Sequence, residues 1–250
     1  ARERVTAYEP ILKDKKVMIV GGGVAGCEAA RVLAVRGHKP ELYEKGSRLG
    51  GNLLPGGAPE FKEDDIALAR WYEVQLQKLN VPVRLKKEVT AEDVLNGGYD
   101  AVIVATGSTP KVFSLGDDAH TFTAAEVLMK EKDCGEHTVV IGGGLVGCET
   151  ALWLAQHGKK VTVVEALDKI LAVNGPLCHA NKDMLERLIP YNGIEVVTGA
   201  KAKEYHDGIL SVECADGERT IACDSVILSV GYKEENALYH ELEFKVPEIY

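Results

Sequence analysis

The stretch that decides the fold lies near the start of the chain and reads Met18-Ile-Val-Gly-Gly-Gly-Val-Ala-Gly-Cys-Glu-Ala-Ala30. It returns later as Val139-Val-Ile-Gly-Gly-Gly-Leu-Val-Gly-Cys-Glu-Thr-Ala151. The two copies align without a gap when Gly21 is placed on Gly142. Similarity at one fixed offset over so many positions indicates an internal repeat rather than chance.

A second pair of segments extends the repeat. Asp100-Ala-Val-Ile-Val-Ala-Thr-Gly107 is echoed by Asp224-Ser-Val-Ile-Leu-Ser-Val-Gly231, now at a slightly larger offset. The chain is therefore expected to hold two homologous units, the second of which has gained three residues between its two conserved segments.

Each copy predicts a strand, a helix and a second strand. The apolar runs 17–20 and 139–141 suit parallel strands buried on both faces. Residues 24–35 and 145–157 are Ala-rich and carry apolar residues at helical spacing, and each segment is followed by a glycine suited to a left-handed helix end, Gly37 or Gly158. The next strands end at Glu44 and Glu165. This order predicts an α/β chain of two Rossmann-like, doubly wound domains.

Shorter signals add detail to this fold. Asp207-Gly208 and Asp216-Gly217 supply tight hairpin turns between strands expected at 201–205, 209–214 and 219–223. We expect a small antiparallel meander of this kind in each unit. A helix is expected around residues 64–79, with Trp71 and Tyr72 as core aromatics.

The glycine pattern Gly-x-Gly-x-x-Gly carries the chemistry. In Gly21-x-Gly23-x-x-Gly26 the first glycine makes a turn, the second lets a diphosphate approach the backbone, and the third permits close packing. The helix that follows offers unpaired N–H groups to the diphosphate. Glu44 follows Gly26 at close to the spacing expected for a carboxylate that binds ribose hydroxyls.

The second copy meets the same tests, with Gly142, Gly144 and Gly147, and with Glu165 at the same distance along the chain from its third glycine. Two sites imply two nucleotides. Glu165 would repel a 2′-phosphate, and Ala166 and Leu167 offer no cation to bind one. NADH is therefore expected rather than NADPH.

Composition limits the other functions that the chain could have. The formal net charge of −9 disfavours nucleic-acid and anionic membrane partners, and no apolar run has the length of a membrane span. The chain begins without Met, which suggests a fragment. The six cysteines form no Cys-x-x-Cys pair and no zinc pattern, so we expect no metal site, no disulfide redox chemistry and a cytoplasmic location.

Three further motifs carry a family resemblance: Arg48-Leu-Gly-Gly-Asn52, Gly57-Ala-Pro-Glu-Phe-Lys-Glu-Asp-Asp65 and Ala105-Thr-Gly-Ser-Thr-Pro110. With the two nucleotide sites, they make the chain resemble the C-terminal half of 2-enoate and 2,4-dienoyl-CoA reductases. These are NADH:flavin oxidoreductases related to old yellow enzyme, within the wider pyridine nucleotide-disulfide oxidoreductase-like class.

The resemblance implies a domain plan and a partner. Residues 1–112 and 233–250 would form an FAD-binding domain, and residues 113–232 an inserted NAD(H)-binding domain. In that family an N-terminal barrel of the same polypeptide carries FMN and a four-iron cluster, and it reduces an activated carbon–carbon double bond with electrons relayed from FAD. The barrel is absent here, and the residues before Lys13 would be the connection to it.

The resemblance also implies site residues, although it implies no catalytic acid or base. FAD would be bound by Gly21, Gly23, Gly26, Glu44, Arg48, Gly51, Asn52, Thr106 and Gly107. NADH would be bound by Gly142, Gly144, Val146, Gly147, Glu149, Glu165 and Gly231. Glu149 would lie near the nicotinamide, but an acidic residue is also favoured in a first helical turn by the helix dipole alone.

Two alternatives remain open from sequence. Related amine dehydrogenases keep this double fold but bind ADP as a structural ligand in the outer site, and a purely structural module is also conceivable. In addition, the family's FAD domain continues with a Gly-Asp pair after the point where this chain reaches Tyr250. The FAD pocket is therefore expected to be incomplete.

Overall fold

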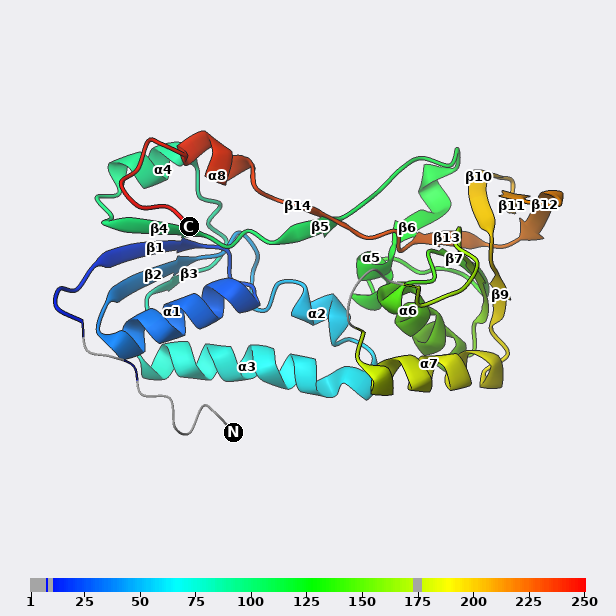
Figure 1. Ribbon diagram of the computed structural model, residues 1–250, viewed down its shortest axis with the longest axis horizontal. Coiled ribbons are helices and arrows are strands. Elements are labelled where there is room, and N and C mark those ends of the chain that lie inside the picture. The colour runs from blue at the N-terminus through cyan, green and yellow to red at the C-terminus, as the bar shows by residue number, and fades with distance from the viewer. Residues whose placement is uncertain (1–7, 9–10, 173–176) are drawn as a thin grey trace. The chain divides into compact units, whose positions relative to one another are not determined.

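The computed structural model describes residues 8, 11–172 and 177–250, and the chain divides into two compact units (Figure 1). The first unit contains the residues up to Gly57 together with Lys62–Ser108 and Glu234–Tyr250. The second contains Ala58–Phe61 and Thr109–Lys233. The segment expected before Lys13 as a connection lies mostly outside the described residues.

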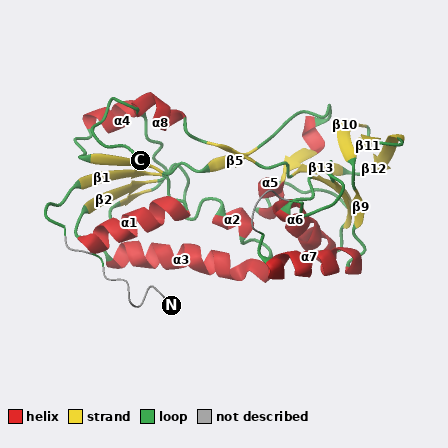
Figure 2. Ribbon diagram, in the orientation of Figure 1, coloured by secondary structure: helices red, strands yellow, loops and turns green. Residues whose placement is uncertain are grey.

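The first unit is built on a four-stranded parallel sheet in the order β3-β2-β1-β4. Its strands are β1 (Lys16–Val20), β2 (Lys39–Tyr43), β3 (Val83–Arg84) and β4 (Ala101–Val104). Beyond β4, Ile249 forms a parallel bridge with Val102. One face of the sheet carries α1 (Val24–Arg36) and α3 (Glu63–Lys78), and the other carries α4 (Ala91–Asn96) and α8 (Ala237–Leu242) (Figures 1 and 2).

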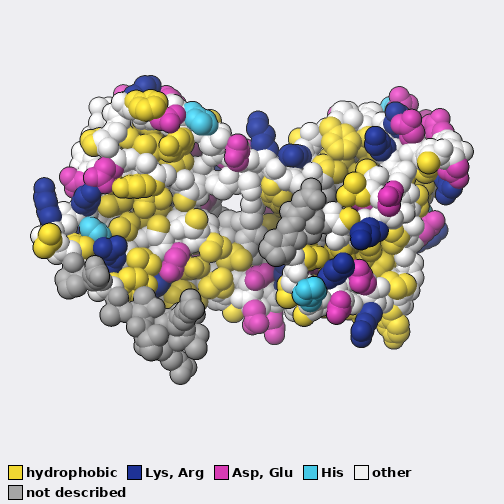
Figure 3. Space-filling view, in the orientation of Figure 1, with side chains coloured by type: hydrophobic (Ala, Val, Ile, Leu, Met, Phe, Trp, Pro, Cys, Tyr) yellow, Lys and Arg dark blue, Asp and Glu magenta, His cyan; other side chains and the backbone are white. Residues whose placement is uncertain are grey.

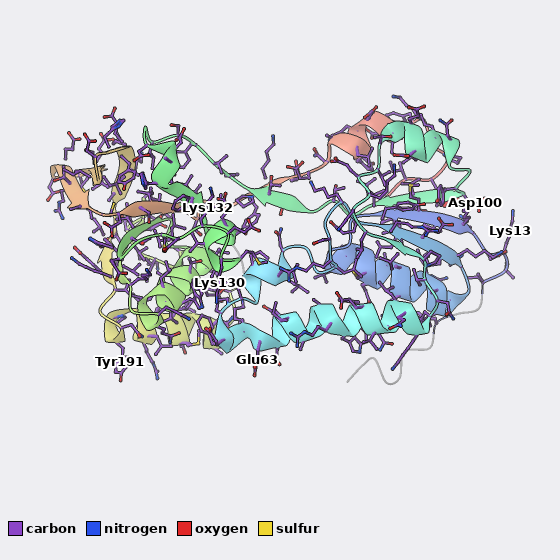
Figure 4. The ribbon with its side chains drawn as sticks, turned by 180° about the vertical axis from the view of Figure 1, so that it is seen from behind. Lys13, Glu63, Asp100, Lys130, Lys132 and Tyr191 are labelled. Atoms are coloured by element: carbon purple, nitrogen blue, oxygen red, sulfur yellow. The ribbon has the colours of Figure 1, made fainter. Side chains whose placement is uncertain are left out.

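The apolar run of β1 is explained by these two layers. Val17 and Ile19 pack with α1 and α3 residues such as Leu76, while Met18 and Val20 pack with residues around α4 and α8. Both faces of the strand are thus buried, as a continuous apolar run predicts. Asp100, labelled in Figure 4, accepts a hydrogen bond from the Lys16 backbone N–H at 2.7 Å, which joins the start of β4 to β1.

The second unit repeats this plan. Its parallel sheet has the order β6-β13-β7-β8-β9, with strands β6 (Thr121–Thr123), β7 (His137–Ile141), β8 (Lys160–Val164), β9 (Glu195–Val197) and β13 (Ser225–Leu228). Val140 packs with α5 (Ala124–Leu128), α6 (Leu145–Gln156) and α7 (His179–Tyr191). Val139 and Ile141 pack on the other face with β10 (Ala200–His206), β11 (Ile209–Cys214) and β12 (Gly217–Ala222).

Small elements complete the described chain. They are α2 (Leu53–Gly56), the 3-10 helices η2 (Glu60–Lys62) and η3 (Asp118–His120), and the strands β5 (Ser108–Pro110) and β14 (Tyr232–Glu234). The last two pair with each other where the chain passes from one unit to the other. None of the described helices is both long and apolar enough to cross a membrane.

The two Rossmann-like units confirm the predicted fold class, but two details differ. Among the described residues, an antiparallel meander is found only in the second unit. In the first, the corresponding face is covered by α4, whose start is set by a reciprocal capping box between Thr90 and Asp93. Trp71 is also not a core residue, because it is 43% exposed on α3 while Tyr72 is buried.

The strand registers show how closely the units correspond. Lys16 pairs with Lys39 and His137 pairs with Lys160, so the partners are equally far apart along the chain in both units. By contrast, Val17 pairs with Ala101, whereas its counterpart Thr138 pairs with Ser225, three positions further along than an exact repeat would place it. The three extra residues therefore lie after the second strand, and the strand–helix–strand portion has the same length in both units.

Candidate functional site

In each unit, the glycine turn is closed so tightly that only glycine fits. Gly21 has φ +109°, and a Cβ there would lie 2.2 Å from the Ala105 carbonyl oxygen. A Cβ on Gly26 would lie 1.9 Å from the Gly21 carbonyl oxygen. Gly142 and Gly147 show the same pattern, with closest approaches of 2.3 and 1.9 Å. These contacts bring the start of each helix directly against the end of the first strand.

The middle glycine of each turn faces open space. Gly23 and Gly144 are the N-cap residues of α1 and α6, with nearly identical extended backbone angles. A Cβ on Gly144 would meet no described atom within 4 Å, and one on Gly23 would meet the Gly51 Cα at 4.0 Å. Each unit thus has room for an anionic group beside the unpaired N–H groups of a helix N-terminus.

A carboxylate is held beside each turn by backbone hydrogen bonds. Gly22 N–H donates to Glu44 Oε2 at 2.7 Å, and Gly46 N–H donates to Oε1 at 2.5 Å. In the second unit, Gly143 N–H donates to Glu165 Oε2 at 2.6 Å, and Leu167 N–H to Oε1 at 2.8 Å. A carboxylate has about four acceptor positions, so each of these groups keeps capacity for ribose hydroxyls.

Predicted residues of the first unit converge on one cavity of about 210 Å³. It opens at the carboxyl ends of the strands and is lined by Gly21, Glu44 and Thr106. Residues that sequence reasoning missed complete the lining: Val20, Tyr43, Lys45, Lys87, Glu88, Val89, Glu235, Ala237 and Leu238. Most of them follow the ends of β2, β3 or β14. Their signal was available in principle, because ligands of parallel α/β sheets bind at the carboxyl ends of the strands.

Hydrogen bonds and close contacts fix four predicted FAD residues within the first unit. Thr106 donates a hydrogen bond to the Glu235 carbonyl, and Glu235 N–H donates to the Gly107 carbonyl at 2.9 Å, so both residues are tied to the returning chain. Asn52 donates from Nδ2 to the Ser108 carbonyl at 3.0 Å. Gly51 lies close against Gly23.

Arg48 lies apart from the first cavity. This residue lines a separate hollow of about 400 Å³ in the same unit, together with Leu49, Glu73 and Leu76. The role of Arg48 in FAD binding stays a prediction.

In the second unit, Val146 and Gly231 line a small pocket with Ser229 and Tyr232. Glu149 lies in the same unit on α6 and is only 6% exposed. Its counterpart in α1, Glu28, is half-exposed and forms an ion pair with Arg31 at 2.7 Å. The two copies have thus diverged at this position, and burial of a carboxylate in the second copy makes Glu149 distinct from a solvated helix acid.

The thiols of Cys27 and Cys148 are buried and bonded to the two glycine turns. Each thiol donates to the carbonyl of the second residue of its turn, Gly22 or Gly143, at 3.3 Å. Burial raises the pKa of both thiols to about 12, so they stay protonated at neutral pH. In the part of the chain that the structure describes, no cluster of His, Cys, Asp and Glu could hold a metal ion.

Comparison with known proteins places this geometry in context. A family model described as pyridine nucleotide-disulphide oxidoreductase matches residues 15–249. Cinnamate reductase of Clostridium sporogenes is 47% identical over 246 residues, which cover 98% of this chain and 37% of that protein. NADH oxidase of Thermoanaerobacter brockii is 38% identical over 87% of this chain and 34% of the relative.

A solved structure of 2-naphthoyl-CoA reductase matches with a TM-score of 0.90 at 30% identity, covering 98% of this chain and 37% of the other. The chain therefore spans about a third of the length of the relatives that it matches.

Proposed function

This chain belongs to the pyridine nucleotide-disulphide oxidoreductase family, and we propose that it is the module of an enoate-reductase-type flavoenzyme that passes electrons from NADH through FAD to a barrel carrying FMN and an iron–sulfur cluster. The barrel belongs to the proposed parent polypeptide and would reduce an activated carbon–carbon double bond. The observation that carries the proposal is the twofold constellation of a closed glycine turn and a carboxylate held by two backbone N–H groups.

The described residues fit the two cofactors of this family. Space beside Gly23 and Gly144 lies at helix N-termini, where a diphosphate is stabilised by unpaired N–H groups and by the helix dipole. Glu44 and Glu165 present carboxylates already oriented for ribose hydroxyls. We assign FAD to the first unit, whose cavity contains Glu44 and Thr106, and NADH to the second.

Gly23 and Glu44 would hold FAD, and Gly144 and Glu165 would hold NADH. The bound pair would supply hydride transfer and one-electron chemistry, and the residues of this chain would hold the two nucleotides in position. The protein does not need an acid or base of its own for this transfer. Glu149, buried on α6, would help to orient the nicotinamide end of the nucleotide.

The preference for NADH rests on Glu165. Its carboxylate lies beside the turn, and Leu167 contributes only a backbone N–H to it. A 2′-phosphate brought to this place would meet a negative charge. Titration of the flavin-loaded protein with NADH and NADPH should therefore show tighter binding of NADH, and equal affinities would contradict the ribose assignment.

The proposal is tested with the purified chain and added FAD. We expect a flavin absorption spectrum that is bleached by NADH without oxygen, and ferricyanide reduction in the ratio NADH + 2 ferricyanide → NAD⁺ + H⁺ + 2 ferrocyanide. Binding of ADP without flavin, and no ferricyanide reduction, would favour the amine-dehydrogenase-like alternative. We also propose a cytoplasmic location, because all six cysteines are free thiols.

A further inference from the structure

The two units hold the residue that carries their carboxylate in the same backbone frame. Lys87 N–H donates to the Glu44 carbonyl at 3.0 Å, and Ala200 N–H donates to the Glu165 carbonyl at 3.0 Å. In both cases the donor follows the strand that pairs beside the carboxylate's own strand, β3 or β9. Lys87 and Ala200 therefore occupy equivalent places in the two units.

The side chains at these two places differ. Lys87 lines the cavity of about 210 Å³ that also contains Glu44. Ala200 is buried in the core between the second sheet and its antiparallel meander. The first unit thus has a basic side chain at its proposed nucleotide site, where the second unit has a buried methyl group.

The ammonium group of Lys87 is fixed by a carboxylate. Its Nζ donates to Asp93 Oδ1 at 2.9 Å and to Asp93 Oδ2 at 3.0 Å. Asp93 also accepts from the backbone N–H and the hydroxyl of Thr90, each at 2.9 Å, in the capping box that begins α4. The Thr90 N–H, the Lys87 ammonium and the Thr90 hydroxyl lower the pKa of Asp93 to about 2, so this carboxylate is ionised at neutral pH. An ammonium group has three N–H donors, so one remains for a ligand.

The surroundings of Lys87 indicate which part of a nucleotide it meets. Val89, Ala237 and Leu238 line the same cavity and give it apolar walls. Such walls suit the flat face of a base, whereas the Glu44 carboxylate is oriented for ribose hydroxyls. Over α4 and α8, at the upper left of Figure 3, basic and acidic side chains lie among hydrophobic ones. Ring nitrogens of adenine are hydrogen-bond acceptors, so they require a donor such as this lysine.

We propose that Lys87, held in place by Asp93, donates a hydrogen bond to the adenine base of FAD, and that this contact is specific to the first unit. Lys87 is then a cofactor-binding residue, and Asp93 is a positioning residue that acts through it. The inference rests on the proposed function, which assigns FAD to the first unit.

Binding of FAD tests the contact without any measurement of activity. Lys87→Gln removes the charge, and Lys86→Gln makes the same change at the neighbouring exposed lysine, which is not among the described residues that line the cavity. Quenching of flavin fluorescence gives the dissociation constant of FAD. This constant should rise at least fivefold in Lys87→Gln and stay unchanged in Lys86→Gln. Equal dissociation constants in the two variants overturn the proposal.

An analogue of FAD that lacks only the adenine base separates a direct contact from a structural effect. It keeps the flavin, the diphosphate and the ribose, so Lys87→Gln and the unsubstituted chain should bind it equally well. If Lys87→Gln weakens binding of FAD and of the analogue by the same factor, the lysine acts on another part of the cofactor or on the fold of the unit, and the proposal is wrong.

A double-mutant cycle tests the positioning role of Asp93. Asp93→Asn should weaken binding of FAD at least threefold in the unsubstituted chain, because Lys87 loses its ionised partner. The same substitution should have no further effect in the Lys87→Gln chain. An equal effect of Asp93→Asn in both backgrounds would show that this carboxylate does not act through Lys87.

The outcomes separate this inference from the proposed function. If the unsubstituted chain with FAD does not reduce ferricyanide with NADH, the proposed function fails. If it does, and Lys87→Gln binds FAD as tightly as the unsubstituted chain, the lysine contact alone is wrong.

Discussion

At the scale of single residues, the proposal depends most on Glu44 and Glu165, the carboxylates that we propose bind ribose hydroxyls. Glu165 is bonded by the backbone N–H groups of Gly143 and Leu167, so its orientation is set before a nucleotide arrives. Preorientation of a charged acceptor reduces the ordering cost of binding. We therefore expect loss of the Glu165 carboxylate to weaken the proposed binding of NADH measurably.

Replacement of Glu165 by Ala should weaken NADH binding about tenfold to a hundredfold, corresponding to a lost charge-assisted hydrogen bond of about 1.5–3 kcal/mol. Bound flavin should be retained. Stopped-flow titration of flavin reduction measures the effect, and Glu186→Ala on exposed α7 is the control because its carboxylate pairs with Lys182 within that helix. Loss of flavin with unchanged NADH affinity would reverse the assignment of cofactors to units.

The buried thiols allow a prediction about pH. Because burial raises the pKa of Cys27 and Cys148 to about 12, the reactive thiolate is scarce at pH 8 and accumulates only as the pH approaches 12. Iodoacetamide at pH 8 should modify exposed Cys178 and leave Cys27 and Cys148 intact until the chain is unfolded in guanidinium. Rapid modification of either buried thiol in the folded chain would contradict a structural role.

At the scale of elements, the glycine contacts define where α1 and α6 begin. Gly147→Ala would bring a Cβ within 1.9 Å of the Gly142 carbonyl oxygen and should destabilise the second unit by about 2–3 kcal/mol or more. Gly158→Ala, at φ +82° with no described atom within 4 Å, should cost only about 1–2 kcal/mol from backbone strain.

Guanidinium unfolding followed by the fluorescence of buried Trp153, in a Trp71→Phe background, reports on the unit that contains α6. If Gly147→Ala and Gly158→Ala had the same free energy of unfolding, the close contact between Gly147 and the Gly142 carbonyl would not be needed for stability.

The elements also show what sequence could predict. Helices α1 and α6 were expected at 24–35 and 145–157. They are found at Val24–Arg36 and Leu145–Gln156. The prediction was close because each helix starts directly after a glycine and is followed closely by another. Their repeated motif also located the carboxylates beside the turns. Helix α4 was missed because it is only six residues long, too short for a clear helical spacing of apolar residues. The Thr90 cap is the main sequence feature that marks its start.

The exposure of Trp71 escaped prediction for a different reason. Helical spacing gives apolar residues on both sides of α3, and only tertiary packing decides that Tyr72 lies inside and Trp71 outside. The individual roles of the predicted site residues stay predictions.

At the scale of the whole molecule, each unit holds its own glycine turn, carboxylate and sheet. A substitution in one proposed site should therefore weaken binding of its own nucleotide and leave binding of the other nucleotide unchanged. Glu44→Ala should lower retention of FAD by about tenfold to a hundredfold in affinity while the binding of NADH, followed by its own fluorescence, stays unchanged. A parallel loss of NADH affinity in the Glu44→Ala chain would argue against one nucleotide per unit.

The strand–helix–strand portions of the two units, residues 16–44 and 137–165, have matching strand registers. In both units, paired residues of the first two strands are equally far apart along the chain. Paired residues of the first strand and the last strand, β4 or β13, are three residues further apart in the second unit. The two copies thus differ in length only after their second strand, and the strand–helix–strand portion with the glycine turn has one length in both. Residues 16–44 and 137–165 therefore have the same length and the same pairing between their two strands. A chimaeric chain in which one of these segments replaces the other should keep that pairing, and its nucleotide preference would show whether the segment alone determines which nucleotide each unit binds.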